Sequence, residues 1–189
     1  MNDLRSAILM FLVFTIICGG AYPAVVTGVA SAVFPRQAAG SFITGADGKE
    51  AGSALIGQPF SAPQYFWPRP SATTDFAYNP MASGGSNAGP TNPDFIKTVG
   101  DRVASLRTTG VTGPIPADLA LASASGLDPH ITPAAARLQI PRIATARRLD
   151  EGAVAALLSR SVEGRQMGFL GEPRVNVLML NLALDRLKP

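Results

Sequence analysis

An uncharged, apolar run over residues 7–34 constrains this chain more than any other feature of its sequence. The hydrocarbon core of a bilayer is about 30 Å thick, and a helix crosses it with about 20 apolar residues. The run exceeds that length, so it predicts a transmembrane helix. A single helix satisfies its own backbone hydrogen bonds in lipid but encloses no aqueous path, so transport by this chain requires partner chains.

Two alternative interpretations of the run fit less well. A cleaved signal peptide begins with a basic segment and ends a shorter apolar stretch at small residues, whereas here Asp3 balances Arg5 and the run continues. The single cysteine, Cys18, follows the bulky Ile17, which disfavours cleavage as a lipoprotein. Pro23 lacks the N–H that a helix interior needs, which predicts a bend or a helix end there.

The rest of the sequence predicts one folded domain. We expect a short tail (residues 1–6), the anchor (7–34) and a single soluble domain (35–189), which is long enough to form its own core. The 19 Gly and 16 Pro place much of the backbone in turns. The expected class is α+β: one N-terminal transmembrane helix followed by a compact domain with several short helices, a few short strands and long ordered loops. A net charge of +3, with basic residues scattered among acidic ones, predicts no nucleic-acid partner.

Capping signals locate the helices. Asn92, followed by proline, predicts a helix whose apolar face packs against the core. Thr132, also followed by proline, begins a region that Pro141 divides into two short helices, and Asp150 caps another helix. Residues 175–187 combine strand-like alternation with helical spacing, and we favour a helix. The apolar face after Asn92 comprises Ile96, Val99, Val103 and Leu106.

Residues 65–93 are rich in Pro, Ser, Gly, Asn and Thr, yet they carry five aromatic side chains. Flexible linkers lack aromatic residues, so this composition predicts an ordered surface loop that presents groups to a partner. The aromatic residues are Tyr65, Phe66, Trp67, Phe76 and Tyr78.

Paired glycines inside this loop form a candidate nucleotide site. They let backbone amides converge on an anion such as phosphate. No Gly-Lys-Ser or Gly-Lys-Thr follows, so this is not a P-loop, and a tight turn explains the glycines equally well. The candidate residues are Ser83, Gly84, Gly85, Ser86 and Asn87.

Ser125, Asp128 and the single histidine, His130, are close neighbours in the sequence. A catalytic triad needs a base that reaches the hydroxyl and a third group that orients the base, and neighbours joined by Pro129 rarely achieve this. One histidine with one aspartate supplies too few ligands for a metal. We therefore expect a helix-entry loop here, with neither a catalytic residue nor a metal site.

A series of short motifs resembles one known family: the C subunit of the bacterial potassium-transporting Kdp P-type ATPase (KdpC). The similarity spans nearly the whole chain and keeps the order of the family. The motifs are Gly-Ser-Ala-Leu-Ile-Gly-Gln at 52–58, Arg-Pro-Ser-Ala at 69–72, Tyr-Asn-Pro at 78–80, Ser-Gly-Gly-Ser-Asn at 83–87, Gly-Pro-Thr-Asn-Pro at 89–93, Ser-Ala-Ser-Gly-Leu-Asp at 123–128, Ile-Thr-Pro at 131–133, Gln-Ile-Pro-Arg at 139–142, Val-Asn-Val at 175–177 and Leu-Asn-Leu-Ala-Leu-Asp at 180–185.

The resemblance implies a non-catalytic accessory subunit of an ATP-driven, high-affinity potassium uptake complex in the bacterial inner membrane. Its partners would be membrane lipids, a channel-like potassium-binding subunit and a P-type subunit that hydrolyses ATP. This chain has no Asp-Lys-Thr-Gly phosphorylation motif, which agrees with a non-catalytic role. The family topology implies a single-pass protein with an extracytoplasmic domain. We also expect no tightly bound cofactor.

The resemblance implies two alternative mechanisms by which the subunit acts on the pump. In one, the subunit raises the ATP affinity of the pump as a catalytic chaperone, and residues 83–87, which are similar to the Ser-Gly-Gly core of transporter signature loops, share ATP with the pump subunit. In the other, the domain lies over the potassium entrance, where it stabilises the assembly or shapes ion access. Outside the family, the alternatives are a membrane-anchored hydrolase using Ser125, Asp128 and His130, and an anchored extracytoplasmic binding module that presents residues 65–93.

Overall fold

A computed structural model describes residues 2–45 and 48–187 and divides the chain into two compact units, Met1–Phe42 and Ile43–Pro189. Residue 1 of the predicted tail and residues 46–47 and 188–189 of the predicted domain lie outside the described residues. The fold combines helices with short strands, which confirms the α+β class.

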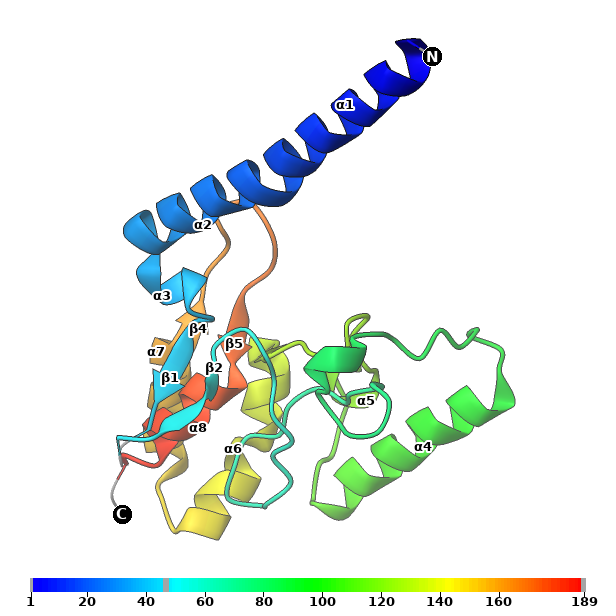
Figure 1. Cartoon of the computed structure of the whole chain (residues 1–189). Coiled ribbons are helices and arrows are strands. Elements are labelled where there is room, and N and C mark those ends of the chain that lie inside the picture. Colours follow the sequence, from blue (N-terminus) through cyan, green and yellow to red (C-terminus); the bar gives the residue numbers. More distant parts are fainter. Residues whose placement is uncertain (1, 46–47, 188–189) are drawn as a thin grey trace. The chain divides into compact units, whose positions relative to one another are not determined.

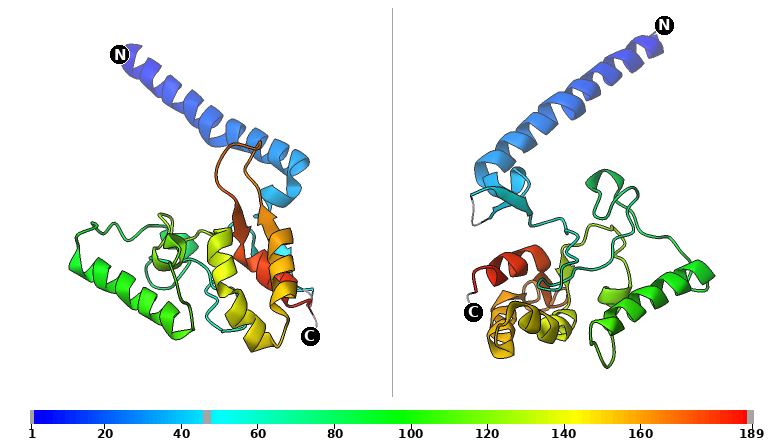
Figure 2. Two further views of the ribbon diagram at one scale, coloured as in Figure 1. Left: turned by 180° about the vertical axis from the view of Figure 1, so that it is seen from behind. Right: turned by 90° about the horizontal axis from the view of Figure 1, so that it is seen from below.

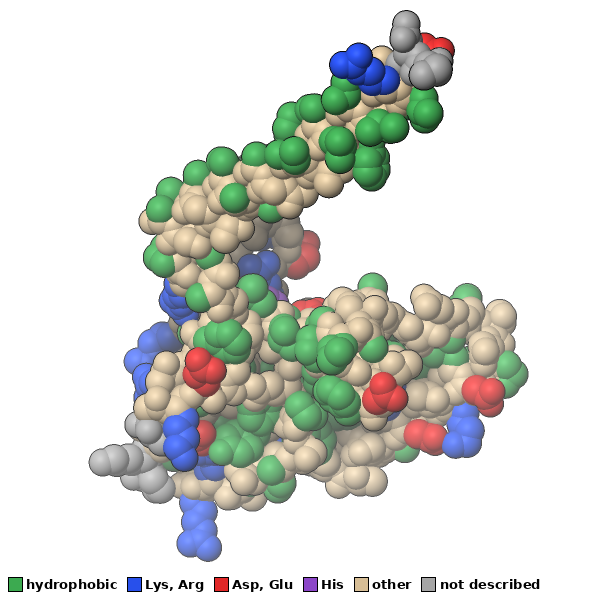
Figure 3. Space-filling model, in the orientation of Figure 1, with side chains coloured by type: hydrophobic (Ala, Val, Ile, Leu, Met, Phe, Trp, Pro, Cys, Tyr) green, Lys and Arg blue, Asp and Glu red, His purple; other side chains and the backbone are tan. Residues whose placement is uncertain are grey.

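The first unit is helical. It contains α1 (Asn2–Ile16), the π-helical turn η1 (Ile17–Ala21), α2 (Tyr22–Val33) and the short α3 (Pro35–Ala38). The continuous stretch Asp3–Val33, 31 residues long, is the one helix in the described part of the chain that is long and apolar enough to cross a membrane. Its apolar side chains are exposed along its length (Figure 3).

The helix passes Pro23 through a π turn instead of ending there. The N–H of Tyr22 donates to the carbonyl of Ile17, five residues earlier, so the turn before the proline is wider than an α-helical turn. The helix axis bends in this region (Figure 1). A π turn of this kind lets a helix absorb a residue that cannot donate a backbone hydrogen bond.

The second unit contains two small antiparallel sheets and most of the helices. Strands β1 (Phe42–Thr44) and β2 (Glu50–Ser53) pair with each other, and β5 (Arg174–Asn176) lies between β3 (His130–Ile131) and β4 (Val162–Glu163). The helical elements of this unit are η2 (Pro80–Ala82), α4 (Pro93–Thr108), α5 (Ala117–Ala120), α6 (Pro133–Arg147), α7 (Glu151–Ser161) and α8 (Val177–Leu184).

Side-chain caps begin the long helices of this unit. Asn92 accepts hydrogen bonds from the first amides of α4, Thr132 from Ala135 in α6, and Asp150 from Ala153 in α7. All three predicted helix starts are therefore confirmed. The mixed pattern after residue 174 also has a simple explanation, because β5 ends where the side chain of Asn176 caps α8.

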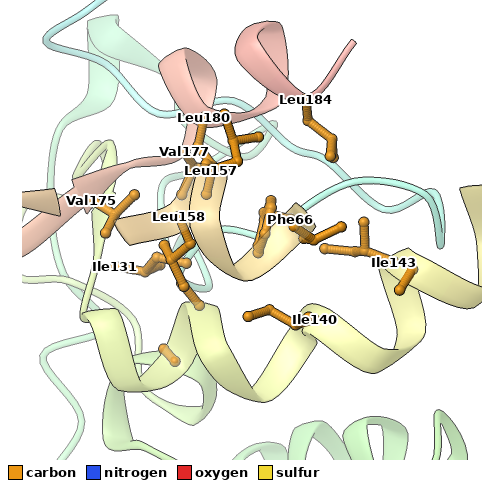
Figure 4. Close-up of a cluster of buried hydrophobic side chains, with 14 of the residues drawn as sticks. Phe66, Ile131, Ile140, Ile143, Leu157, Leu158, Val175, Val177, Leu180 and Leu184 are labelled. Carbon is orange, nitrogen blue, oxygen red and sulfur yellow. The ribbon is translucent and has the colours of Figure 1, made fainter. Parts of the chain in front are cut away.

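Helices α6, α7 and α8 enclose the hydrophobic core together with β5. Figure 4 shows Phe66 among aliphatic side chains of α6, α7 and α8. Removing such a side chain from water stabilises a fold by about 1.5–3 kcal/mol. The fully buried apolar residues include Phe66, Ile131, Ile143, Leu158, Val175, Leu180 and Leu184.

The predicted division of residues 133–147 into two helices is wrong. Helix α6 continues through Pro141, which lies inside it. Both Pro141 and Arg137, whose carbonyl loses its partner to the proline, are exposed, so water replaces the missing bond. A proline on the solvent side of a helix interrupts one hydrogen bond without ending the helix.

The predicted packing of α4 is right only at its C-terminal end. Leu106 is buried, whereas Ile96 is 56% exposed, and Val99 and Val103 are half-buried. Helix α4 contacts α5 and lies away from α6, α7 and α8 (Figure 2). Its apolar pattern therefore marks a face that this unit covers only in part.

Candidate functional site

Residues 65–93, called here the aromatic segment, connect the first residues of the second unit to α4. Apart from η2, the segment consists of turns and irregular backbone up to the capping residue Asn92, and its last residue, Pro93, begins α4. Phe66 anchors it in the core, while Phe76 is 60% and Met81 is 94% exposed. The segment thus combines a buried anchor with exposed apolar side chains.

Two buried amide side chains hold the backbone at Phe66 and Trp67. Asn181 of α8 accepts from the N–H of Phe66 at 2.8 Å and donates to its carbonyl at 3.0 Å. Gln139 of α6 does the same for Trp67, at 2.7 and 3.1 Å. Both amides are at most 2% exposed. They supply the hydrogen bonds that a neighbouring strand would give to buried backbone.

Arg142 of α6 binds the same stretch of backbone. Its Nη2 donates to the carbonyl of Tyr65 at 3.0 Å and to Oε1 of Gln139 at 2.8 Å, and its Nη1 donates to the carbonyl of Pro63. The guanidinium carbon lies 3.9 Å from the centre of the Trp67 ring, a cation–π contact. Burial lowers the pKa of Arg142 to about 10, so it remains charged at neutral pH.

Arg147 and Asp185 complete the attachment. Nε of Arg147 donates to the carbonyl of Gln64 at 2.7 Å, and its Nη2 pairs with Oδ1 of Asp185 at 2.6 Å. The Tyr65 hydroxyl donates to the other oxygen of Asp185 at 3.4 Å. Residues 63–67 are therefore bound from two helices at once. We call this group the α6–α8 clamp: Gln139, Arg142, Arg147, Asn181 and Asp185.

A second cluster surrounds Asp128. Its Oδ2 lies 3.0 Å from Nη1 of Arg69, and its Oδ1 accepts from the backbone N–H of His130 at 2.9 Å. Burial by itself would raise the pKa of Asp128, but the hydrogen bonds from His130 and the charge of Arg69 outweigh it and hold this pKa below its ordinary value. The cluster therefore joins the aromatic segment to the loop that leads into β3.

Tyr78 lies beside this ion pair and is buried. Its hydroxyl donates to the carbonyl of Arg69, and its N–H donates to the hydroxyl of Ser71 at 2.9 Å. Burial raises the pKa of Tyr78 above its ordinary value, Asp128 raises it further, and Arg69 partly opposes them. Tyr78 thus acts as a neutral donor that fixes the backbone around Arg69.

The candidate nucleotide residues pack against the loop at 123–126. The Ser83 hydroxyl and the N–H of Gly84 both donate to the carbonyl of Ser125, at 3.0 Å each. A Cβ on Gly85 would lie 3.0 Å from the carbonyl oxygen of Ala124. Gly85 therefore allows the two loops to approach closely, as the turn interpretation of the motif expects. Nucleotide binding by this loop stays a prediction.

Of the remaining two candidates, Ser86 makes a local hydrogen bond and Asn87 has a left-handed backbone conformation. The hydroxyl of Ser86 accepts from the N–H of Ala88, and Asn87 has a φ of +50°. Ser86 also lines a cavity of about 210 Å³, together with Asp94 and Arg102. Drug-sized ligands usually occupy about 300–1,000 Å³. This cavity is small for a nucleotide.

Ser125, Asp128 and His130 do not form a triad. The hydroxyl of Ser125 accepts from the N–H of Leu127 at 3.1 Å, and no hydrogen bond joins it to His130 within the described residues. The imidazole instead lies between two carboxylates, with Nδ1 3.5 Å from Asp128 and Nε2 3.9 Å from Glu163. The arrangement lacks the nucleophile–base hydrogen bond that the hydrolase alternative requires.

Replacing Asp128 by asparagine should lower the free energy of unfolding by about 1–2 kcal/mol at pH 7, because the charge-assisted bonds to Arg69 and His130 are lost. A depressed folded-state pKa stabilises the fold above the ordinary pKa of aspartate, and that stabilisation is lost as the pH falls through the folded-state value. The variant should therefore also lose part of the acid dependence of the wild type below about pH 4.

Urea unfolding of the full chain in detergent, between pH 2.5 and pH 7, measures both effects. Asp101→Asn is the matched control, because Asp101 pairs with Lys97 on an exposed helix face. This control should leave stability and its pH dependence unchanged. An Asp128→Asn variant as stable as the wild type at pH 7 would contradict the role given to this carboxylate.

Sequence reasoning missed the α6–α8 clamp. Gln139 and Asn181 lie on the buried faces of α6 and α8, and a polar residue at a core-facing position is the one available signal, because buried polar groups need partners. The partners themselves are the backbone groups of residues 63–67, more than 70 positions away in the chain. Nothing in the local pattern points to them.

Comparisons with known proteins all point to one family. A family model described as K⁺-transporting ATPase, c chain (KdpC) matches residues 4–186. Among similar proteins, the potassium-transporting ATPase KdpC subunit of Geobacter sulfurreducens is 66% identical over 189 residues and covers 100% of both chains. The KdpC subunit of Geotalea uraniireducens is 68% identical over 187 residues, 99% of each chain. That of Methylococcus capsulatus is 57% identical over 189 residues, again 99% of each.

Proposed function

The chain belongs to the KdpC family of K⁺-transporting ATPase subunits, and we propose that it is a non-catalytic accessory subunit that assembles and stabilises the pump. In this role it raises the affinity of the complex for potassium or ATP. Its partners are the channel-like potassium-binding subunit and the P-type subunit, which carries out ATP hydrolysis. The candidate membrane helix anchors it in the inner membrane beside them.

The observation that carries this proposal is the fixed conformation of the aromatic segment. Irregular backbone normally moves, yet here Gln139 and Asn181 bind it through buried hydrogen bonds. A loop held in one conformation loses little conformational entropy when it binds, so more of its contact energy becomes affinity. The exposed Phe76 and Met81 are the kind of side chains that anchor protein interfaces.

An anchored domain also binds its neighbours with little loss of translational freedom. Membrane attachment holds it at a high effective concentration near partner subunits that span the same bilayer. Such a subunit can stabilise an assembly with a modest contact surface. This agrees with a holding role better than with a separate enzymatic activity.

We place the soluble domain outside the inner membrane, near the potassium entrance. The packing of Gly84 and Gly85 against residues 123–126 supports this choice, because it gives the motif a structural task that needs no ATP. Protease added to intact spheroplasts tests the placement. Cleavage after Arg36 supports it, whereas protection until lysis would favour a cytoplasmic domain that contacts ATP through residues 83–87.

Deleting this chain should abolish growth when external potassium is scarce and leave growth unaffected when potassium is abundant. The physical reason is that a pump without its stabilising subunit loses activity or affinity, which matters only at low substrate concentration. Growth rates across a potassium series measure the effect, with re-expression of the chain as the control. Wild-type growth of the deletion strain at low potassium would contradict the proposed function.

A further inference from the structure

The loop between β4 and β5 ends in an exposed apolar tip. Met167 is 87% exposed, Phe169 68% and Leu170 47%. Gln166 and Leu170 pair as an antiparallel bridge beneath the turn, with backbone hydrogen bonds of 2.9 Å in both directions. The tip is therefore an ordered turn. We call residues 166–170 the hairpin tip.

The backbone of the tip shows that an apolar residue occupies an unfavourable turn position. The N–H of Phe169 donates to the carbonyl of Gln166, and the two residues between them, Met167 and Gly168, have φ values of +52° and +83°. Turns with two positive φ values favour Asn, Asp or Gly, because a Cβ is disfavoured in this region. Met167 is thus exposed, and its backbone has a conformation that is unfavourable for a residue with a Cβ. A glycine at this position would serve the fold at least as well.

Charged residues are confined to the stem below the tip. Arg165 pairs with both oxygens of Glu172, at 2.9 and 2.8 Å. One step further from the tip, Arg174 pairs with Glu163 at 3.0 Å. The hairpin is therefore apolar at its end and carries paired charges along its stem. A bilayer interface has the same order of environments, from acyl chains through headgroups to water.

The chain itself keeps the folded unit that carries this hairpin close to a bilayer. The candidate membrane helix ends at Val33, and the second unit begins at Ile43. The connecting residues 34–42 span at most about 3.6 Å each, so the folded unit starts within about 35 Å of the membrane surface. A partner protein must be supplied, whereas this lipid surface is always present.

We propose that the hairpin tip inserts Met167, Phe169 and Leu170 into the interface of the bilayer that its own anchor crosses. The tip then forms a second, reversible attachment of the folded unit to the membrane. The paired charges of the stem lie at headgroup level. This attachment restricts the rotation of the unit about its connector and so orients the aromatic segment relative to the membrane.

Spin-label accessibility in the full chain tests this directly. Cys18 is first replaced by alanine, so that the spin label attaches only to a cysteine introduced by Gln166→Cys. This position leaves the apolar tip residues native. The labelled chain is reconstituted in phosphatidylethanolamine–phosphatidylglycerol vesicles. Collisions with oxygen report lipid, and collisions with a nickel chelate report water. The same label at Met81→Cys is the matched control, because Met81 is exposed in η2, elsewhere on the same unit.

The oxygen-to-nickel collision ratio at position 166 should exceed that at position 81. It should fall to the value at position 81 when Met167→Ser and Phe169→Ser are added. Equal ratios at the two positions, or a ratio unaffected by the serine substitutions, would overturn the proposal. Shielding that appears only when the other pump subunits are present would also overturn it, because the tip would then bind protein and not lipid.

Discussion

Replacing Asn181 by alanine is expected to lower the free energy of unfolding by about 3–5 kcal/mol. The side chain is 1% exposed and satisfies both the N–H and the carbonyl of the buried Phe66. Alanine removes both partners at once, and no water reaches the two backbone groups without opening the core. Each buried group left without a partner costs about 1–3 kcal/mol, and the vacated volume adds to this.

Chemical unfolding of the variant in detergent, followed by far-ultraviolet circular dichroism, gives this value. Met179→Ala is the matched control, because Met179 lies on the exposed face of the same helix. It should change stability by no more than about 0.5 kcal/mol. A loss below about 1 kcal/mol for Asn181→Ala would show that the clamp does not hold the aromatic segment.

Gly57→Ala is expected to cost about 3 kcal/mol of unfolding free energy, although it adds one methyl group. An ideal Cβ at this position would lie 2.3 Å from Cε1 of Tyr78 and 2.9 Å from the carbonyl oxygen of Asp128. The ring of Tyr78 must then move, which breaks the hydrogen bond from its hydroxyl to the carbonyl of Arg69. Overpacking and the lost hydrogen bond act together.

Thermal and urea unfolding measure this effect against Gly89→Ala, a glycine with no heavy atom within 4 Å of an added Cβ. The control should change stability by about 0.5 kcal/mol or less. The double variant Gly57→Ala with Tyr78→Leu should recover part of the loss, because the smaller side chain leaves room for the methyl group. If the second substitution adds its full cost instead, the clash is not with Tyr78.

Local signals in the sequence predicted the helix starts well. Asn92, Thr132 and Asp150 cap helices because their side chains accept from amides two or three residues later, an interaction within one turn of chain. The same local reasoning failed at Pro141. Whether a proline ends a helix depends on which side of the helix faces water, and that is set by the packing of α6 on α7 and β5.

The candidate site was predictable only in outline. Aromatic content indicated that residues 65–93 are ordered, and burial of Phe66 agrees with this. The cause of this order could not be predicted from the sequence, because Asn181 binds the backbone of a residue 115 positions away in the chain. Likewise the glycines at 84 and 85 suggest an anion site in the sequence, whereas in the structure Gly85 lies against the carbonyl of Ala124. That long-range contact could not be predicted from the sequence, and nucleotide binding by the loop stays a prediction.

We expect the aromatic segment to bind the other subunits of the pump. The most direct measurement is affinity purification of the complex through a tag on the ATP-hydrolysing subunit, with the double variant Phe76→Asp and Met81→Asp in place of the wild-type chain. Both side chains are exposed, so the isolated variant should fold as the wild type does by circular dichroism. Met179→Asp, an exposed substitution outside the segment, is the control.

The double variant should be depleted from the purified complex by about tenfold or more, because a charge buried at an interface costs at least about 1.4 kcal/mol. The control should be recovered at the wild-type level. Recovery of the double variant at the wild-type level, with unchanged potassium-stimulated ATP hydrolysis, would contradict the claim that this segment holds the pump together.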